Sequence, residues 1–154
     1  RFAGQAAVEP GALRILKDLR PGDTHRELEV CVPGDALSRA LETITEAVPA
    51  YAQGVLPPSH AVRLAHMTRP TVMAKASVPH VGLFGGLEVR HLAGPLRADV
   101  TYHARTVILK LTESPKTENV WYEVIFNDPA TGVDVGSVRY LLRIMKNSSP
   151  LYAG

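Results

Sequence analysis

The side chains best suited to acid–base chemistry stand at one point of the chain, the sequence Pro57-Pro58-Ser59-His60. Serine is a favoured N-cap residue, so Ser59 is expected to open a helix that His60 enters at once. An imidazole titrates near neutral pH and can give or take a proton there. His60 is therefore the histidine best placed to serve a site, and a surface or capping role is the competing interpretation.

The other histidines and the single cysteine do not form a metal or redox centre in the sequence. The six histidines include no His-x-x-x-His pair and none has a cysteine partner at ligand spacing, so no metal site is expected. His66 follows His60 at a spacing that does not place both on one helical face, which makes it structural. Cys31 excludes an internal disulfide and is expected to be a small buried side chain.

Two helices are expected around Ser59. Pro33-Gly34-Asp35 follows an alternating strand, Thr24–Val32, and Asp35 is a credible N-cap for the first helix. Proline disfavours helical backbone in the residue before it, so Pro49 is expected to end this helix. Its apolar stripe consists of Leu37, Leu41, Ile44 and Val48. The second helix is expected to run from His60 to about Arg69, where Pro70 breaks or kinks it.

The back half of the chain, Val81 to Lys146, is typical of successive strands. Gly85-Gly86 inside the first of them predicts a bulge or a close backbone approach. The last three strands are joined by short polar turns and predict an antiparallel meander. Together with the helices ahead of them, they indicate an α+β fold in which a curled antiparallel sheet wraps a central helix. The expected strands are Gly82–Leu92, Ala98–Thr112, Asn119–Asn127 and Val133–Met145.

Size and charge narrow the function classes. With 154 residues, 45% of them hydrophobic, the chain is expected to form one domain at 13–146, after a loose lead-in at 1–12 and before a tail at 147–154. The net charge of +2 comes from scattered Lys and Arg, which argues against nucleic acid as a partner and favours a phosphate-bearing ligand. No segment predicts a membrane span or a signal peptide, so a cytoplasmic protein is expected.

Three stretches carry a resemblance to a known family: Leu19-Arg20-Pro21-Gly22-Asp23, Val55-Leu56-Pro57-Pro58-Ser59-His60, and Gly85–His91 with Gly94-Pro95-Leu96-Arg97-Ala98-Asp99. With the order of elements, they resemble the MaoC-like acyl dehydratases and (R)-specific enoyl-CoA hydratases, which have a hotdog fold. The double proline most resembles the degenerate half of double-hotdog members or a non-catalytic subunit. The resemblance implies fatty-acid chemistry on acyl-CoA or acyl-carrier-protein thioesters, with no cofactor.

The catalytic pattern of that family is altered here. It pairs an aspartate with a histidine five residues later, and no Asp-x-x-x-x-His occurs in this sequence. By position, the resemblance places Glu46 at the aspartate and Tyr51 at the histidine, on either side of Pro49. Glu46 could act as a base, whereas Tyr51, with an ordinary pKa of about 10, is suited to donating a hydrogen bond. The competing interpretations are a solvated carboxylate and a packed loop tyrosine.

The binding half of such a site is expected to persist. The N–H groups that open the Ser59 helix could polarise a thioester carbonyl, and His60 completes the catalytic candidates with Glu46 and Tyr51. His80 could line the mouth of an acyl tunnel. The substrate-binding candidates are therefore Ser59, His80, Gly85 and Gly86.

Three functions remain open. The first is a hydratase or dehydratase of enoyl- and 3-hydroxyacyl thioesters with an altered acid/base set, and the second is a non-catalytic hotdog subunit that binds acyl chains or completes an active heterodimer. The third is a thioesterase that uses a carboxylate such as Glu46. Each is expected to form a homodimer or heterodimer, because an exposed edge strand is a liability that pairing removes.

Overall fold

The computed structural model describes residues 7–9, 12–76 and 78–153. Residues 1–6, 10 and 11 of the predicted lead-in lie outside the described residues. Within the described residues the first strand is followed by four short helices, four longer strands and two 3-10 turns. These elements are β1 (Thr24–Val30), α1 (Gly34–Leu41), α2 (Pro49–Ala52), α3 (Pro58–His66), α4 (Arg69–Met73), β2 (Gly82–His91), β3 (Tyr102–Glu113), β4 (Thr117–Asp128), β5 (Val133–Met145), η1 (Lys146–Ser148) and η2 (Pro150–Tyr152).

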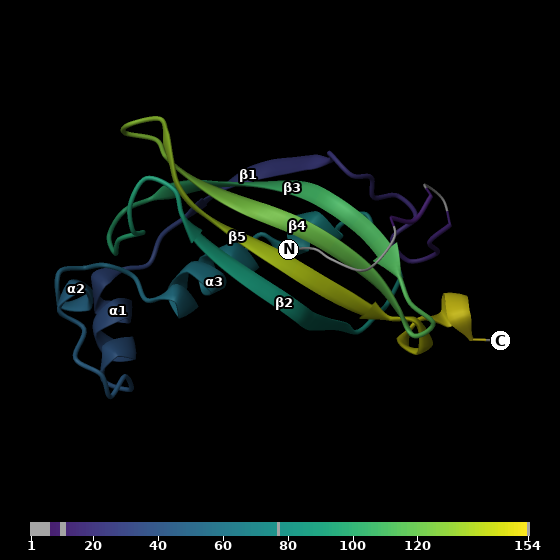
Figure 1. The fold of residues 1–154 in the computed structure, drawn as a ribbon, viewed down its shortest axis with the longest axis horizontal. Coiled ribbons are helices and arrows are strands. Elements are labelled where there is room, and N and C mark those ends of the chain that lie inside the picture. Colours follow the sequence, from purple (N-terminus) through teal and green to yellow (C-terminus); the bar gives the residue numbers. More distant parts are fainter. Residues whose placement is uncertain (1–6, 10–11, 77, 154) are drawn as a thin grey trace.

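The strands form one antiparallel sheet in the order β1-β3-β4-β5-β2. Strands β3, β4 and β5 are neighbours in sequence and in space, which confirms the predicted meander. Strand β1 joins its outer side at β3, and β2 joins the other side at β5. The sheet curls, and α3 lies behind it in the view of Figure 1, as expected for a sheet wrapped around a helix.

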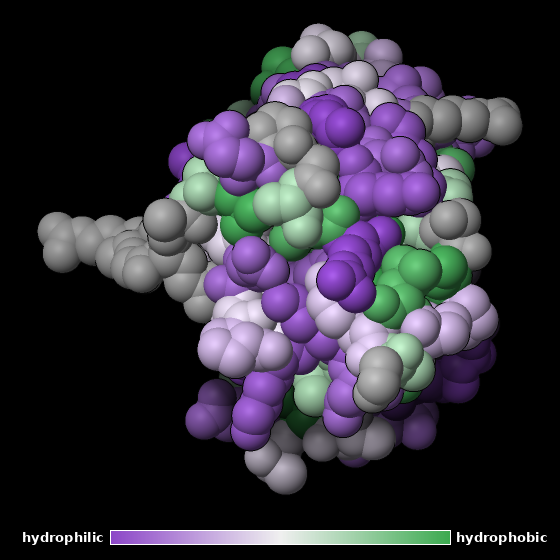
Figure 2. Space-filling view, turned by 90° about the vertical axis from the view of Figure 1, so that its right-hand side faces the viewer, coloured by the Kyte–Doolittle hydropathy of each residue, from purple (hydrophilic) through white to green (hydrophobic). Residues whose placement is uncertain are grey.

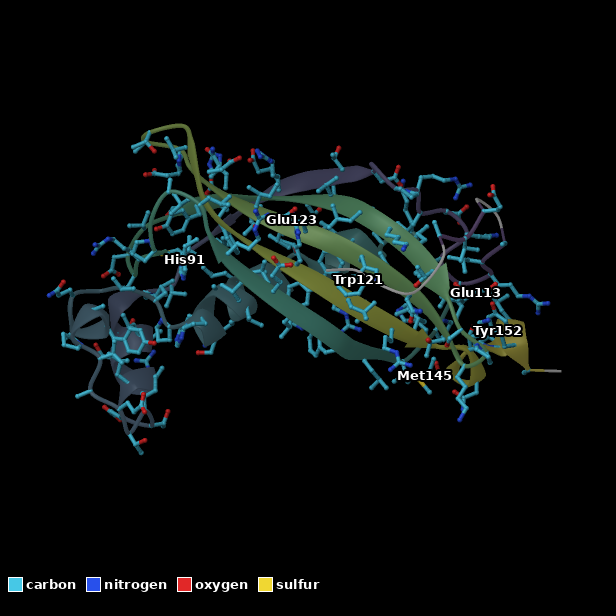
Figure 3. The ribbon with its side chains drawn as sticks, viewed as in Figure 1. His91, Glu113, Trp121, Glu123, Met145 and Tyr152 are labelled. Atoms are coloured by element: carbon cyan, nitrogen blue, oxygen red, sulfur yellow. The ribbon has the colours of Figure 1, made fainter. Side chains whose placement is uncertain are left out.

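The two faces of the sheet differ in chemistry because side chains alternate along each strand. On the face that packs against α3, Tyr122 and Phe126 of β4 are fully buried. On the opposite face lie Trp121 and Glu123 (Figure 3). There Glu123 accepts a hydrogen bond of 2.6 Å from the Ser137 hydroxyl and forms ion pairs with arginines of β2 and β5. The core therefore lies on one face only.

The core continues beyond α3 into the turn at residues 13–19, which buries Leu13, Ile15, Leu16 and Leu19. This turn is fixed by one buried carboxylate, that of Glu118 in β4. Backbone N–H groups of three successive residues, Arg14 to Leu16, donate to it over 2.8–3.2 Å. The hydroxyl of Tyr152 donates to it from η2. A buried charge with several donors satisfies the rule that buried polar groups are hydrogen-bonded.

Helix α1 is shorter than the apolar stripe predicts. It ends at Leu41, where Thr43, Ile44 and Thr45 follow, and three β-branched residues in a row disfavour helix. The Thr43 hydroxyl also bonds back to the carbonyl of Ala40, an alternative to continued helix. The predicted helix across residues 42–48 is therefore wrong.

The predicted roles of Pro49 and Ser59 were also wrong. Pro49 does not end a helix but begins α2, because proline suits the first helical position, where its missing N–H costs no bond. The second helix begins at Pro58, one residue before the predicted cap, with Pro57 as its N-cap and no side-chain cap bond. Ser59 therefore lies inside α3 and does not cap it.

Other boundaries shifted for local reasons. The second predicted helix breaks after His66 and resumes at Arg69 as α4, so Pro70 lies near a helix start. The predicted bulge is confirmed, because the pairing of β2 with β5 shifts register between Phe84 and Gly86. Cys31 is exposed, contrary to prediction, since it alternates with buried Val30 and Val32.

The end of the molecule where the chain terminates is mostly polar. Figure 2 faces that end and shows hydrophilic residues around small apolar patches. The helices within the described ranges are all too short or too polar to cross a membrane.

Replacing Glu118 by glutamine should lower the free energy of unfolding by about 2–3 kcal/mol, because charge-assisted bonds to buried N–H groups are lost. Urea denaturation measures this change. Glu113→Gln is the matched control: Glu113 faces Glu118 across β3 and β4, but it is exposed and pairs with Lys146. It should cost less than about 1 kcal/mol. Equal losses in the two variants would show that the Glu118 contacts do not hold the turn.

Candidate functional site

The first turn of α3 is the best-supported candidate site. His60 is 7% exposed, and its Nδ1 is buried without a hydrogen-bond partner among the described residues. The backbone N–H of His60 bonds to the Pro57 carbonyl. Ser59 beside it is exposed, and its backbone N–H has no acceptor in the described part of the chain. The turn thus offers an unused imidazole nitrogen and a free helix-start donor next to each other.

Helix α3 is held over the sheet by packing and by one hydrogen bond. Ala61, Leu64 and Ala65 form its buried face. The hydroxyl of Tyr140 in β5 donates to the backbone carbonyl of Val62. Tyr140 in turn stacks on Tyr122 of β4, with ring centroids 5.2 Å apart. The sheet therefore fixes the position of the helix, and with it the position of His60.

Burial makes His60 a neutral imidazole at neutral pH. The pKa of His60 lies below the usual 6.5, chiefly because burial penalises the charged form and also because Arg63 repels it. A neutral imidazole can accept a proton, so His60 has the protonation state that a general base needs.

Glu46 and Tyr51 come together, but away from His60. Both line an open pocket of about 370 Å³. Every residue that lines it belongs to the segment 41–52, so neither the sheet nor α3 contributes a wall. Figure 1 shows α1 and α2 standing apart from the sheet. Glu46 is exposed and Tyr51 half-buried, and most of the pocket lining is apolar.

The loop between β2 and β3 binds to two other segments, the residues just before α3 and the start of α1. The N–H of Leu56, just before α3, donates to Leu96, and that of Ala98 donates to Gly54. The carboxylate of Asp99 accepts a bond of 2.8 Å from the N–H of Gly34 at the start of α1. Asp99 therefore supplies the cap that was predicted for Asp35, from 65 residues away in sequence.

This cap requires unusual backbone geometry. Asp99 has a φ of 60°, a left-handed conformation that aspartate tolerates better than most residues. A Cβ on Gly34 would lie 2.6 Å from an Asp99 oxygen, so any other residue there would displace the capping carboxylate. Asp35 itself pairs with Arg39 on the exposed side of α1. The contact between Asp99 and Gly34 explains why β3 begins at Tyr102 and not at Ala98.

The remaining predicted site residues lie elsewhere. Gly85 and Gly86 belong to the bulge in β2, where a Cβ on Gly85 would lie 2.7 Å from side-chain atoms of Leu141 and Arg143. His80 lines a second pocket at the far end of α3, together with His66. The structure therefore distributes the predicted residues over four places: Glu46 with Tyr51, Ser59 with His60, Gly85 with Gly86, and His80 alone.

Sequence reasoning missed Asp99 and Arg69. Asp99 acts across a long loop, and no local pattern indicates such a contact. Arg69 lies three residues after His66, a spacing that places the two on one helical face, but the helix breaks between them. The described residues hold no group of three or more His, Cys, Asp or Glu side chains able to bind a metal ion.

Solved structures share this architecture at low sequence identity. The Mycobacterium tuberculosis HadBC complex, a 3R-hydroxyacyl-ACP dehydratase, matches with a TM-score of 0.67 at 16% identity, over 80% of this chain and 96% of that one. A MaoC-like dehydratase matches with a TM-score of 0.65 at 15% sequence identity, over 83% of this chain and 43% of that one. The chain has the hotdog fold.

A third hotdog neighbour is the monoamine oxidase regulatory protein from Archaeoglobus, with a TM-score of 0.65 at 16% identity. The match covers 86% of this chain and 94% of that one. No protein-family model and no curated protein matches the sequence. At these identities the likeness establishes the fold, and function has to be argued from the site.

His60 should make stability depend on pH. Its pKa is lowered in the folded chain, so below 6.5 the unfolded chain binds more protons, and stability falls as the pH drops through that range. The His60→Gln variant should not show the part of this fall in stability that His60 contributes. Urea denaturation gives the free energy of unfolding of both proteins well above and well below pH 6.5, and the change between the two pH values is compared. His25, whose pKa burial also lowers, is present in both and cancels. The same change in free energy for the wild type and for His60→Gln would contradict a buried neutral His60.

Proposed function

We propose that this chain is a MaoC-like hotdog subunit that binds an acyl thioester beside α3. In this proposal it pairs through β2 with a second hotdog domain, and that domain supplies the acid/base groups that the chain lacks. The observation that carries the proposal is the contrast between the two edge strands of the sheet.

The two edges are protected differently. Strand β1 exposes Glu27 and Glu29 and has an irregular register between His25 and Leu28, features that discourage further pairing. Among the described residues, strand β2 pairs with β5 on one side only. The edge at β2 is therefore the one suited to a partner strand.

Strand β2 also exposes large apolar side chains. Leu83 and Leu87 are each half exposed, and Phe84 is 54% exposed. Val81, just before the strand, extends this surface. Apolar residues beside unpaired backbone groups are typical of a surface that is covered in an assembly. The HadBC neighbour, itself a complex, supports pairing of this kind.

The binding of a thioester is supported by the start of α3. A thioester carbonyl needs a hydrogen-bond donor, and the free N–H of Ser59 is one. The acyl chain also needs an apolar wall, and α3 packs against the apolar core of the sheet. The predicted acid/base residues Glu46 and Tyr51 line a separate pocket, and this separation favours a subunit that depends on its partner for proton transfer.

A hydratase active on its own is the second candidate, and His60 is the observation that favours it. Hydration of an enoyl thioester adds hydroxide from water to the β-carbon while a base takes the water proton, and the α-carbon gains a proton from an acid. A neutral His60 suits the base. An acid beside it is needed as well, but Glu46 and Tyr51 line the separate pocket formed by residues 41–52.

A thioesterase has less support. It would need a carboxylate to activate water at the thioester carbon, and Glu46 was the candidate. Glu46 is exposed in a pocket whose lining includes neither Ser59 nor His60.

Charge on the β2 edge should disrupt pairing. Leu87→Glu places a carboxylate in the apolar surface and should weaken the dimer at least about tenfold, which corresponds to 1.4 kcal/mol. Sedimentation equilibrium measures the change, for the chain alone or with a hotdog partner. Val133→Glu is the control, because Val133 is an exposed apolar residue beside the β4–β5 turn. A wild-type chain that stays monomeric in both settings would exclude pairing through β2.

Turnover separates the two candidates. The purified chain, alone and mixed with an active hotdog dehydratase subunit, is given short and medium enoyl-CoA, and loss of the conjugated thioester absorbance is followed. The subunit proposal expects turnover only in the mixture. Turnover by the chain alone would favour the hydratase, and His60→Ala should then slow it at least about a hundredfold, as for loss of a general base. Absence of acyl-thioester binding in every setting would remove both candidates.

A further inference from the structure

A second pocket, at the bend between α3 and α4, has a different chemical character. It has a volume of about 410 Å³ and is open to solvent. It is lined by His66, Met67, Arg69, Pro70, Met73 and His80. Its polar groups are one guanidinium and two imidazoles, and its lining contains no carboxylate. Such a lining stabilises a negative charge.

Arg69 is the unusual member of this set. It is half-buried, yet its guanidinium makes no hydrogen bond or ion pair with the residues that the structure describes. Other arginines of the chain are paired: Arg39 lies 2.7 Å from Asp35, and Arg105 lies 2.6 Å from Asp134. A partly desolvated guanidinium without an acid is costly unless something else binds it.

The guanidinium is held at the edge of the core by the start of β2. Its Nη2 lies 2.7 Å from the point where a Cβ on Gly82 would stand. The same point lies 3.2 and 3.3 Å from methyl groups of Leu142 and Ile144, which are both buried. The hydroxyl of Tyr122, fully buried and without a partner in the described chain, is close enough for the charge of Arg69 to act on its pKa.

The two imidazoles are held by contacts of different kinds. The ring of His66 packs against Phe84, with centroids 5.4 Å apart, and its Nδ1 is buried with no partner among the described residues. The Nδ1 of His80 lies 2.8 Å from the carbonyl of Val78, to which it donates, so its Nε2 is left for solvent or a ligand. The pocket is thus ordered before any ligand arrives, which lowers the cost of binding.

We propose that this pocket binds the anionic end of a small molecule, a carboxylate or a phosphate group, with Arg69 as its main partner. The Nε2 of His80 and the ring of His66 flank the anion, and Met67 and Met73 contact an adjoining apolar part. The proposal goes beyond the thioester function, because the pocket lies at the opposite end of α3 from His60 and requires neither turnover nor a second subunit.

Calorimetric titration of the full chain at low ionic strength tests the site with three separate probes: inorganic phosphate, octanoate and coenzyme A. Saturable binding of at least one is expected. If phosphate and coenzyme A bind and octanoate does not, the ligand carries a phosphate group. If only octanoate binds, the ligand carries a carboxylate. Arg69→Gln should weaken the binding at least about tenfold, because charge-assisted hydrogen bonds are the strong class.

Two further variants make the test specific. Gly82→Ala retains every charge but fills the space of the Arg69 Nη2, so it should also weaken binding, while thermal denaturation reports whether the fold persists. Arg63→Gln removes the same charge from the exposed side of α3, outside the pocket, and should bind like the wild type. No saturable binding of any probe, or equal affinity in Arg69→Gln and wild type, would overturn the proposal.

Discussion

A short helix has to cover a long sheet, and most of the structure follows from that mismatch. Helix α3 has 9 residues, about 14 Å at 1.5 Å per residue. Strand β5 has 13 residues, about 43 Å at 3.3 Å per residue. The helix therefore covers only a part of the apolar face, and other segments must bury the rest. The turn at residues 13–19 covers one end, and the segments beside the β2–β3 loop cover the other.

Segments without regular structure can do this only if their backbone polar groups are satisfied. Two acidic side chains supply much of what is needed. Glu118 accepts three consecutive N–H groups of the N-terminal turn, and Asp99 accepts the N–H that opens α1. Both act far along the sequence from the groups that they satisfy. Carboxylates of strand β4 and of the β2–β3 loop thus anchor the segments that cover the sheet.

Strands could be predicted well from the sequence, and capping contacts could not. Strand β5 was predicted with its observed bounds, and Gly85-Gly86 correctly predicted a bulge, because alternation and glycine act locally. The cap at Asp99 depends on a left-handed backbone 65 residues from its partner, which no local pattern reveals. The candidate site divided similarly. His60 was found because a helix start is a local signal, whereas Arg69 became notable only when the structure left it without an acid.

The same mismatch gives the two ends of α3 different chemistry. At its start, packing against the sheet buries His60 and removes its charge, so that end favours a neutral carbonyl and an apolar chain. At its end the chain bends before α4, and there the Arg69 guanidinium lies beside Gly82 at the edge of the core. A helix long enough to cover the sheet would have no such bend, and Arg69 would then lie along a continuous helix. That this guanidinium has no acid among the described residues is therefore a consequence of the short helix, and the glycine at position 82 provides the space that it occupies.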